Sequence, residues 1–230
     1  MAENASSPPR SIRSFVTRAG RITEAQQRAL QQLWPRYGIE FAPQPLDPRA
    51  LFGREAPLTV EIGFGNGDNL VRLAATHPER HFLGIEVHRP GVGRVLLAAE
   101  SQHLDNLRVI CHDAVEVLQQ QIAAGSVDEM LILFPDPWPK KRHHKRRLVQ
   151  PDFIQQVTRS LKPGGVVRLA TDWQPYAEHM LEVLRATPGL ANAACDDGFA
   201  PRAPERLPTR FEKRGERLGH AVWDLCFRKL

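Results

Sequence analysis

Cysteines and long apolar runs are both scarce in this sequence. Its 230 residues include 3 cysteines, Cys111, Cys195 and Cys226, which lie far apart and form no Cys-x-x-Cys or Cys/His ligand spacing. This pattern argues against a disulfide framework and against structural zinc. No stretch approaches the roughly 18 apolar residues of a membrane span, and the first residues lack the apolar core of a signal peptide. We therefore expect a soluble, cytoplasmic protein with no metal.

Positive charge is concentrated in three segments. The net charge is +5, but residues 140–147, KKRHHKRR, hold six Lys or Arg and no acid. Residues 1–36 and 201–230 each carry +4, so the two segments between these basic ones carry −9. Clustered Lys and Arg release counterions when they meet phosphates, which favours a nucleic acid as partner. A solvated basic loop and an anionic membrane surface are the alternatives.

The chain divides into three expected regions. Residues 1–20 begin with a Ser- and Pro-rich stretch without apolar periodicity, which predicts a disordered leader. Residues 21–57 form an N-terminal helix and connector: TEAQQRALQQLW (23–34) predicts a short amphipathic helix that Pro35 helps to end, and 42–57 is irregular because Pro and Gly punctuate it. Residues 58–230 form the main domain.

In the main domain, short apolar runs alternate with helical periodicity. The expected strands are 58–63, 81–87, 107–112, 128–134 and 164–171, and the expected helices are 69–78, 93–104, 116–123, 151–161 and 175–186. Strands that alternate with helices pair in parallel through right-handed crossovers. The fold class is therefore α/β, a Rossmann-like doubly wound sheet, and residues 221–230 predict a final antiparallel strand.

A glycine loop follows the first strand of this domain, where such sheets hold nucleotide cofactors. Gly63, Gly65 and Gly67 lack the Gly-x-Gly-x-x-Gly spacing of a dinucleotide site, and no Walker loop is present. Acidic residues stand at or next to three successive strand ends, as Glu61, Glu86 and Asp113. Carboxylates and an open loop suit S-adenosylmethionine, which carries a ribose, a sulfonium and an amino group. A surface charge for Glu86 and a helix cap for Asp113 are the alternatives.

A proline-rich loop, Phe134-Pro135-Asp136-Pro137-Trp138-Pro139, ends the fourth strand and leads directly into the basic run. Three prolines fix φ and make the loop stiff, which suits a substrate clamp beside the cofactor. Trp138 either stacks on a base or supports the loop. His143 and His144 are expected to be neutral members of a binding surface rather than acid–base catalysts.

Six segments of the chain, EIGFGNG, GIEVHRPG, FPDPWPKKRHHKRRL, LKPGG, TDW and TRFE, together resemble the bacterial tRNA (guanine-N7)-methyltransferase family. The resemblance implies a class I S-adenosylmethionine-dependent methyltransferase that acts on the guanosine at position 46, in the variable loop of tRNA. It implies Asp136 as the catalytic residue. Either a monomer or a homodimer fits, and no obligatory protein partner is evident.

The resemblance also assigns roles to further positions. The expected cofactor-binding residues are Glu61, Gly63, Gly65, Gly67, Glu86, Asp113 and Asp136. The expected guanosine-binding residues are Lys140, Asp172, Thr209, Arg210, Phe211 and Glu212. The expected tRNA contacts are Arg142, His143, His144, Lys145, Arg146 and Arg147.

The chemistry of guanine N7 asks for positioning rather than proton abstraction. N7 carries an in-plane lone pair and no proton, so no general base is obligatory. Either Asp136 or Asp172 is suited to grip the N1–H and N2 edge, and a nearby carboxylate stabilises the positive charge that develops on the ring. Asp-Pro-Trp also resembles the loops of methyltransferases that modify exocyclic amino groups, and a non-enzymatic RNA-binding protein is a further alternative.

Overall fold

The computed structural model describes residues 14–15, 21–196, 198–204, 206, 212 and 221–230. The predicted leader therefore lies outside the described residues except for Ser14 and Phe15, and so do Thr209, Arg210 and Phe211. Among the described helices, none combines the length and the apolar character that a membrane crossing requires.

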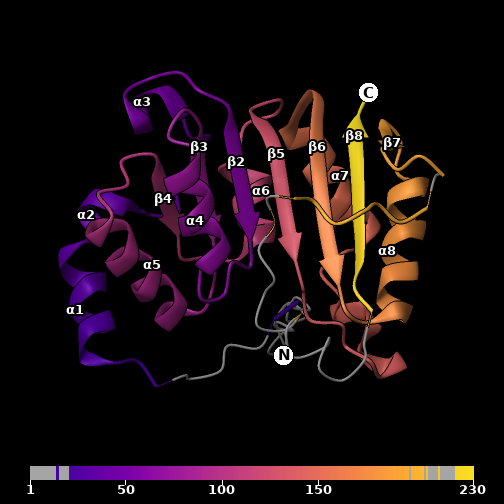
Figure 1. Ribbon diagram of the computed structural model, residues 1–230, viewed down its shortest axis with the longest axis horizontal. Helices are drawn as coiled ribbons and strands as arrows, with labels where there is room; N and C mark the ends of the chain where they lie inside the picture. Colours follow the sequence, from indigo (N-terminus) through magenta and orange to yellow (C-terminus); the bar gives the residue numbers. More distant parts are fainter. Residues whose placement is uncertain (1–13, 16–20, 197, 205, 207–211, 213–220) are drawn as a thin grey trace, which may run out of the picture.

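The described strands form a single eight-stranded sheet in the order β1-β4-β3-β2-β5-β6-β8-β7 (Figure 1). They are β1 (Gly38–Ile39), β2 (Leu58–Ile62), β3 (His81–Ile85), β4 (Leu107–Ile110), β5 (Val127–Leu133), β6 (Leu161–Thr171), β7 (Leu190–Asn192) and β8 (Trp223–Lys229). Strands β1 to β6 pair in parallel, and β8 runs antiparallel to both β6 and β7. The prediction of a doubly wound sheet with a final antiparallel strand is confirmed.

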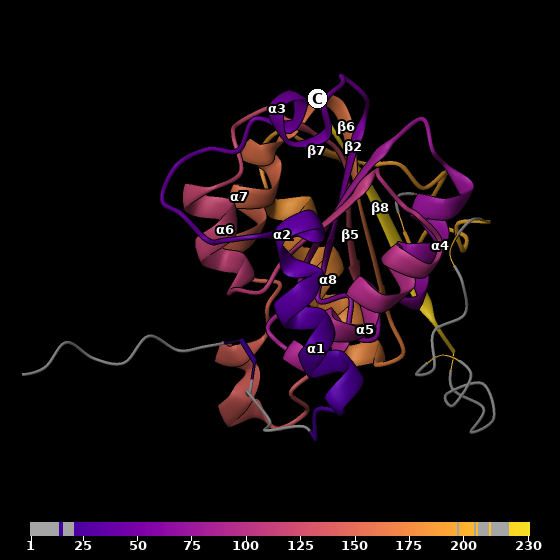
Figure 2. The same ribbon diagram turned by 90° about the vertical axis from the view of Figure 1, so that its left-hand side faces the viewer.

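Helices cover both faces of this sheet. They are α1 (Glu24–Gln32), α2 (Trp34–Tyr37), α3 (Pro48–Phe52), α4 (Asp68–Thr76), α5 (Arg89–Ser101), α6 (Ala114–Gln120), α7 (Pro151–Ser160) and α8 (Gln174–Ala186), with a 3₁₀ helix η1 (Lys141–Arg146). Figures 1 and 2 show α4 and α5 on one face and α6, α7 and α8 on the other.

Each face has its own hydrophobic core, because successive side chains of a strand point to opposite sides. In β3, Phe82 packs into the core under α4 and α5, whereas Leu83 and Ile85 pack into the core under α6, α7 and α8. Both faces are therefore buried, as a parallel sheet requires.

The N-terminal region is more ordered than its Pro and Gly content suggests. Helix α1 begins at a capping box in which the Thr23 side chain and the Gln26 side chain each satisfy the other's backbone N–H. Pro35 does not simply end this helix, since it occupies the first turn of α2, where a missing N–H costs nothing. The expected connector likewise contains α3, which Asp47 caps and Pro48 begins.

Candidate cofactor and substrate site

A cleft of about 190 Å³ lies at the carboxyl edge of the sheet, where the strand order reverses between β2 and β5. Ligands of doubly wound sheets bind at such a switch point. The cleft brings together four of the predicted site residues, namely Gly63, Glu86, Asp113 and Asp136. They come from four different loops, so only the assembled sheet places them side by side.

The glycine loop between β2 and α4 is held in a conformation that disfavours side chains. Gly63, Gly65 and Gly67 have φ values of 71°, 57° and 75°. At Gly67 a Cβ would lie 2.0 Å from Cγ2 of Val95 in α5, so a larger residue at this position is strained by both φ and contact. Gly91, at the start of α5, is a residue that the sequence reasoning missed: a Cβ there would lie 1.9 Å from the Gly65 carbonyl oxygen.

The Glu86 carboxylate is buried and organises this loop. It accepts hydrogen bonds from the backbone N–H of Gly65 at 2.8 Å, of Val87 at 2.6 Å and of His88 at 2.9 Å. The alternative of a surface charge is therefore wrong. A carboxylate offers about four acceptor positions and these bonds use three, so Glu86 can both shape the loop and accept a ligand hydroxyl.

Glu61 is buried behind the loop rather than in the wall of the cleft formed by the described residues. Its carboxylate accepts a hydrogen bond of 3.0 Å from the Asn69 side-chain amide in α4. Burial, helped by the neighbouring Glu86 charge and opposed by the hydrogen bond from Asn69, raises the pKa of Glu61 to about 7. Sequence reasoning did not find Asn69, although it lies in the first turn of the helix that the glycine loop begins.

Asp113 combines two roles that the sequence left as alternatives. Its side chain caps α6 by accepting from the Val115 N–H at 3.0 Å, and it also lines the cleft. The adjacent His112 lines the cleft too and was not predicted. Its ring stacks on Phe41 at 3.8 Å and is hydrogen bonded to Glu116, so a flat, immobilised ring forms part of the wall.

The proline-rich loop places Asp136 at the mouth of the cleft, with its side chain exposed. Two residues of the loop, Phe134 and Trp138, have positive φ values of 53° and 44°. Such backbone costs of the order of 1–3 kcal/mol per residue and persists only where surrounding contacts enforce it. The loop is therefore held in its conformation by its neighbours.

Arg147 is one of those neighbours, and this corrects its prediction as a tRNA contact. Only 4% of Arg147 is exposed. Its Nε donates to the Pro137 carbonyl oxygen at 3.0 Å, its Nη2 lies 3.2 Å from the His144 ring, and the guanidinium stacks 4.8 Å from the centre of the Tyr176 ring. Arg147 thus fastens the loop to α8 and has no guanidinium surface to offer to a phosphate.

Trp138 is also occupied by protein contacts. Its indole N–H donates to the Ser14 carbonyl oxygen at 3.2 Å, the Arg146 guanidinium lies 5.0 Å from the ring centre, and His143 meets the ring edge-on at 5.9 Å. Of the two interpretations of Trp138, the structure favours support of the loop over stacking on a base.

The rest of the basic run forms η1 and faces solvent to different degrees. Lys141, Arg142 and Lys145 are exposed, whereas His143, His144 and Arg146 are half-buried. Slight burial and the neighbouring cations Arg142, Arg146 and Lys140 lower the pKa of His143, which favours the neutral ring. The role of His143 in a binding surface stays a prediction.

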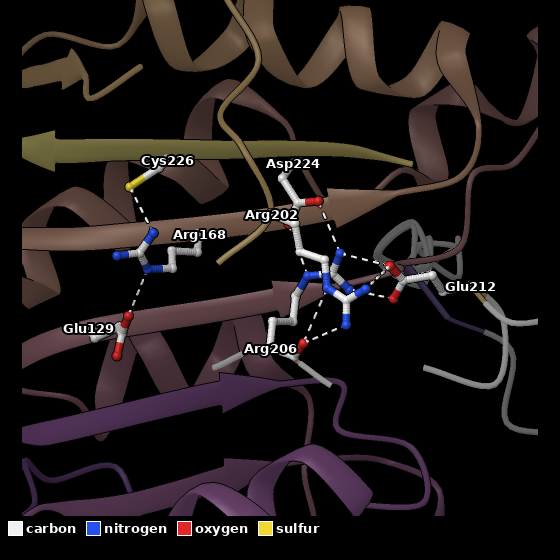
Figure 3. Close-up of polar contacts among 7 residues, drawn as sticks. All are labelled: Glu129, Arg168, Arg202, Arg206, Glu212, Asp224 and Cys226. Carbon is white, nitrogen blue, oxygen red and sulfur yellow. Dashed lines mark hydrogen bonds and ion pairs between the residues drawn. The ribbon is translucent and has the colours of Figure 1, made fainter. Parts of the chain in front are cut away.

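The remaining predicted guanosine contacts are only partly brought to this edge. Lys140 is exposed directly before η1, and Asp172 is half-buried directly after β6. Glu212 differs from a simple ligand, because its carboxylate is buried and bonded to Arg206 through both oxygens, at 2.7 Å and 3.1 Å (Figure 3).

Comparisons with known proteins agree with the fold and identify the family. Residues 55–225 match a family model described as a putative methyltransferase. Two structures share the fold: the 16S rRNA methyltransferase KamB (TM-score 0.54, 16% identity, covering 93% of this chain and 98% of that chain) and a variant of the 16S rRNA (adenine(1408)-N(1))-methyltransferase from Catenulisporales acidiphilia with its cosubstrate SAM (TM-score 0.53, 21% identity, 80% and 92%).

Sequence relatives are much closer. Proteins named tRNA (guanine-N(7)-)-methyltransferase are 59% identical in Leifsonia xyli subsp. xyli (95% of this chain, 96% of the relative) and 56% identical in Aeromonas hydrophila subsp. hydrophila (96% and 93%). A third, in Stutzerimonas stutzeri, is 56% identical over 99% of this chain and 96% of the relative. Identity of this extent places the chain in one family: it belongs to the tRNA (guanine-N(7)-)-methyltransferases.

Proposed function

We propose that this chain transfers the methyl group of S-adenosylmethionine to N7 of a guanosine in tRNA, at position 46 of the variable loop. The observation that carries the proposal is the direct succession of a nucleotide cleft, a fixed Asp136 loop and a basic 3₁₀ helix at one edge of the sheet. Family membership supports the base and the atom, and the resemblance of the motifs supports the position.

The cleft residues fit S-adenosylmethionine. Glu86 keeps an acceptor position for a ribose hydroxyl after binding three backbone N–H groups. A Cβ built at Gly63 or Gly65 would meet nothing within 4 Å, so the backbone there is open to a ligand. Asp113 and Asp136 add negative charge beside the cleft, which suits a cation. When bound, the cofactor supplies an electrophilic methyl group on a sulfonium.

Asp136 acts on the acceptor by position and charge. Guanine N7 needs no proton removed, so the side chains have to hold the ring with N7 in line at about 3 Å from the methyl carbon. Asp136 is the acid on the stiff loop beside the cleft, where its carboxylate stabilises the positive charge that the purine gains. Lys140 and Asp172 flank the same edge and orient the base.

The exposed cations of η1 bind the tRNA backbone. Their phosphate contacts position the substrate and carry no sequence information, so the choice of nucleotide falls to the cleft. Arg147 is not part of this surface. The chain works in the cytoplasm, where its tRNA substrate is found. It acts as a monomer or homodimer.

The test is an assay with labelled S-adenosylmethionine and unmodified tRNA, followed by mass analysis of the nucleosides. We expect 7-methylguanosine, and we expect its loss when the guanosine at position 46 is replaced by adenosine in an otherwise identical tRNA. Formation of N6-methyladenosine would show that the loop serves amino-group methylation instead. Absence of any product with intact cofactor binding would favour a binding protein.

A further inference from the structure

A buried charge cluster lies outside the cofactor cleft, at the carboxyl ends of β5 and β6 (Figure 3). Arg206, Glu212 and Asp224 are only 7%, 2% and 9% exposed. The Arg206 guanidinium binds both oxygens of Glu212 and both oxygens of Asp224, the latter at 2.9 Å and 3.0 Å. One arginine thus joins two carboxylates that are 12 residues apart in the sequence.

Stability alone gives a poor account of such a cluster. Removing three charges from water costs several kcal/mol per ion, and well-packed apolar residues are often as stable in the same place. Desolvation raises the pKa of Asp224 despite the opposing pull of Arg206, so the cost is felt at this acid. What the bidentate pairs do provide is fixed geometry, because the planar guanidinium fork allows few orientations.

The cluster also touches the loop of the active site. The Arg206 guanidinium carbon lies 5.5 Å from the centre of the Phe134 ring. Phe134 lines the cofactor cleft and stands two residues before Asp136, in strained backbone. Arg206 lines a separate cavity of about 230 Å³, together with Ala200, Pro201, Ala203 and Pro204. The contact therefore joins a residue that lines one cavity to a residue that lines the other.

The other ends of the cluster are fixed to the sheet. Asp224 lies in β8 directly opposite Ala170 of β6, and the Phe134 backbone N–H donates to the Ala170 carbonyl oxygen at 2.8 Å. Arg206 consequently connects two parts of the molecule: it contacts the sheet through Asp224 and the active-site loop through Phe134. The bidentate bond from Arg206 also fixes the Glu212 carboxylate relative to the sheet and the loop.

We propose that Arg206 is a positioning residue for methyl transfer, which fixes Glu212 and Phe134 relative to each other at the edge where the guanosine binds. This inference rests on the proposed function, since it assigns Arg206 a role in that reaction. Arg206 acts through its neighbours and contacts neither the cofactor nor the reacting atoms. Loss of its fork should therefore slow the reaction while cofactor binding persists.

The test is Arg206→Lys, which keeps the charge but cannot bind two carboxylates through a planar fork. We expect kcat with tRNA, counted per cofactor-binding site, to fall at least tenfold, and the Kd for S-adenosylmethionine to stay within twofold. A purely structural role would lower the number of binding sites and leave kcat per site unchanged, and that result would overturn the proposal. Arg202→Lys is the matched control, because Arg202 is 40% exposed and lies 3.5 Å from Glu212, and we expect near-normal kcat.

Two further variants keep the proposal falsifiable if Arg206→Lys fails to fold. Asp224→Asn removes one charged anchor that does not line the cofactor cleft, and we expect kcat per site to fall several-fold; an unchanged kcat would overturn the proposal. Adding Arg206→Lys to Glu212→Gln should lower kcat per site little further, because both substitutions act through the same contact. Fully additive losses of kcat would contradict the proposal. Wild-type protein that makes no 7-methylguanosine would refute the proposed function, independently of these comparisons.

Discussion

Arg147 and Arg142 belong to the same basic run but are expected to respond to substitution in opposite ways. Replacing Arg147 with Met keeps much of the buried volume and removes the bond to the Pro137 carbonyl and the stacking on Tyr176. A hydrogen bond from a charged group contributes about 1.5–3 kcal/mol and a desolvated cation–π contact up to about 2 kcal/mol. The cost of burying the guanidinium offsets part of this sum.

We therefore expect Arg147→Met to lower the free energy of unfolding by about 1–3 kcal/mol, on the basis of these partly cancelling contributions. For a chain of this size that corresponds to a fall in Tm of about 2–12 °C. The rate of tRNA methylation should fall as well, since the loop that carries Asp136 loses its fastening.

Binding of tRNA at several salt concentrations separates the two arginines. Arg142 is exposed in η1, so Arg142→Met should reduce the slope of log K against log salt by about 0.7–0.9 and leave Tm nearly unchanged. Arg147→Met should leave this slope unchanged. If Arg147→Met lowered the slope as Arg142→Met does, with Tm unaffected, the assignment of Arg147 to the loop would be refuted.

Three further predictions concern the cofactor edge. Burial raises the folded-state pKa of Glu61 to about 7, so its contribution to stability is full below about pH 4.5 and is lost as pH rises through 7. In thermal melts at pH 4–8, Glu61→Gln should remove up to about 3 kcal/mol of this pH dependence. Parallel curves of stability against pH for the two proteins would contradict the prediction. Gly67→Ala should lower the free energy of unfolding by more than about 2 kcal/mol. Gly125→Ala, also at positive φ but with open space around its Cβ, should lower it by about 1 kcal/mol. Equal Tm shifts would count against the close approach of residue 67 to Val95. Asp136→Asn should reduce kcat by about 100-fold or more. Its Tm should stay nearly unchanged because the side chain is exposed, and an active variant would remove Asp136 from the mechanism.

Much of the fold could be predicted because its signals are local. The alternation of apolar runs and helical periods predicted the strands from β2 to β6 and the helices from α4 to α8, and the isolated last strand predicted β8. Strands β1 and β7 were not predicted, since a strand of two or three residues is too short to show an alternating apolar pattern. Helix α3 escaped because Pro48 looked like a breaker, although proline is favourable in the first turn.

The candidate site was predictable where a residue type and its place at a strand end agree. Glycines after β2 and acids at the ends of β3 and β4 follow from the chain order, because parallel strands present their carboxyl ends at one edge. The sequence could not distinguish a helix cap from a ligand at Asp113, which proves to serve as a cap while lining the cleft. It also gave no sign that His112 would line the cleft or that Asn69 would bond to the buried Glu61.

The sequence by itself determined the order of strands and helices, the glycine loop, the stiff loop around Asp136 and the concentration of positive charge. Only the tertiary structure decided which charges face solvent and which are buried: Arg147 lies under the loop while Arg142 is exposed, and Arg206 binds Glu212 and Asp224. The physical reason is one of range. Periodicity and turn chemistry act between near neighbours in the chain, whereas ion pairing depends on distances in space that exist only once the sheet has aligned its strands.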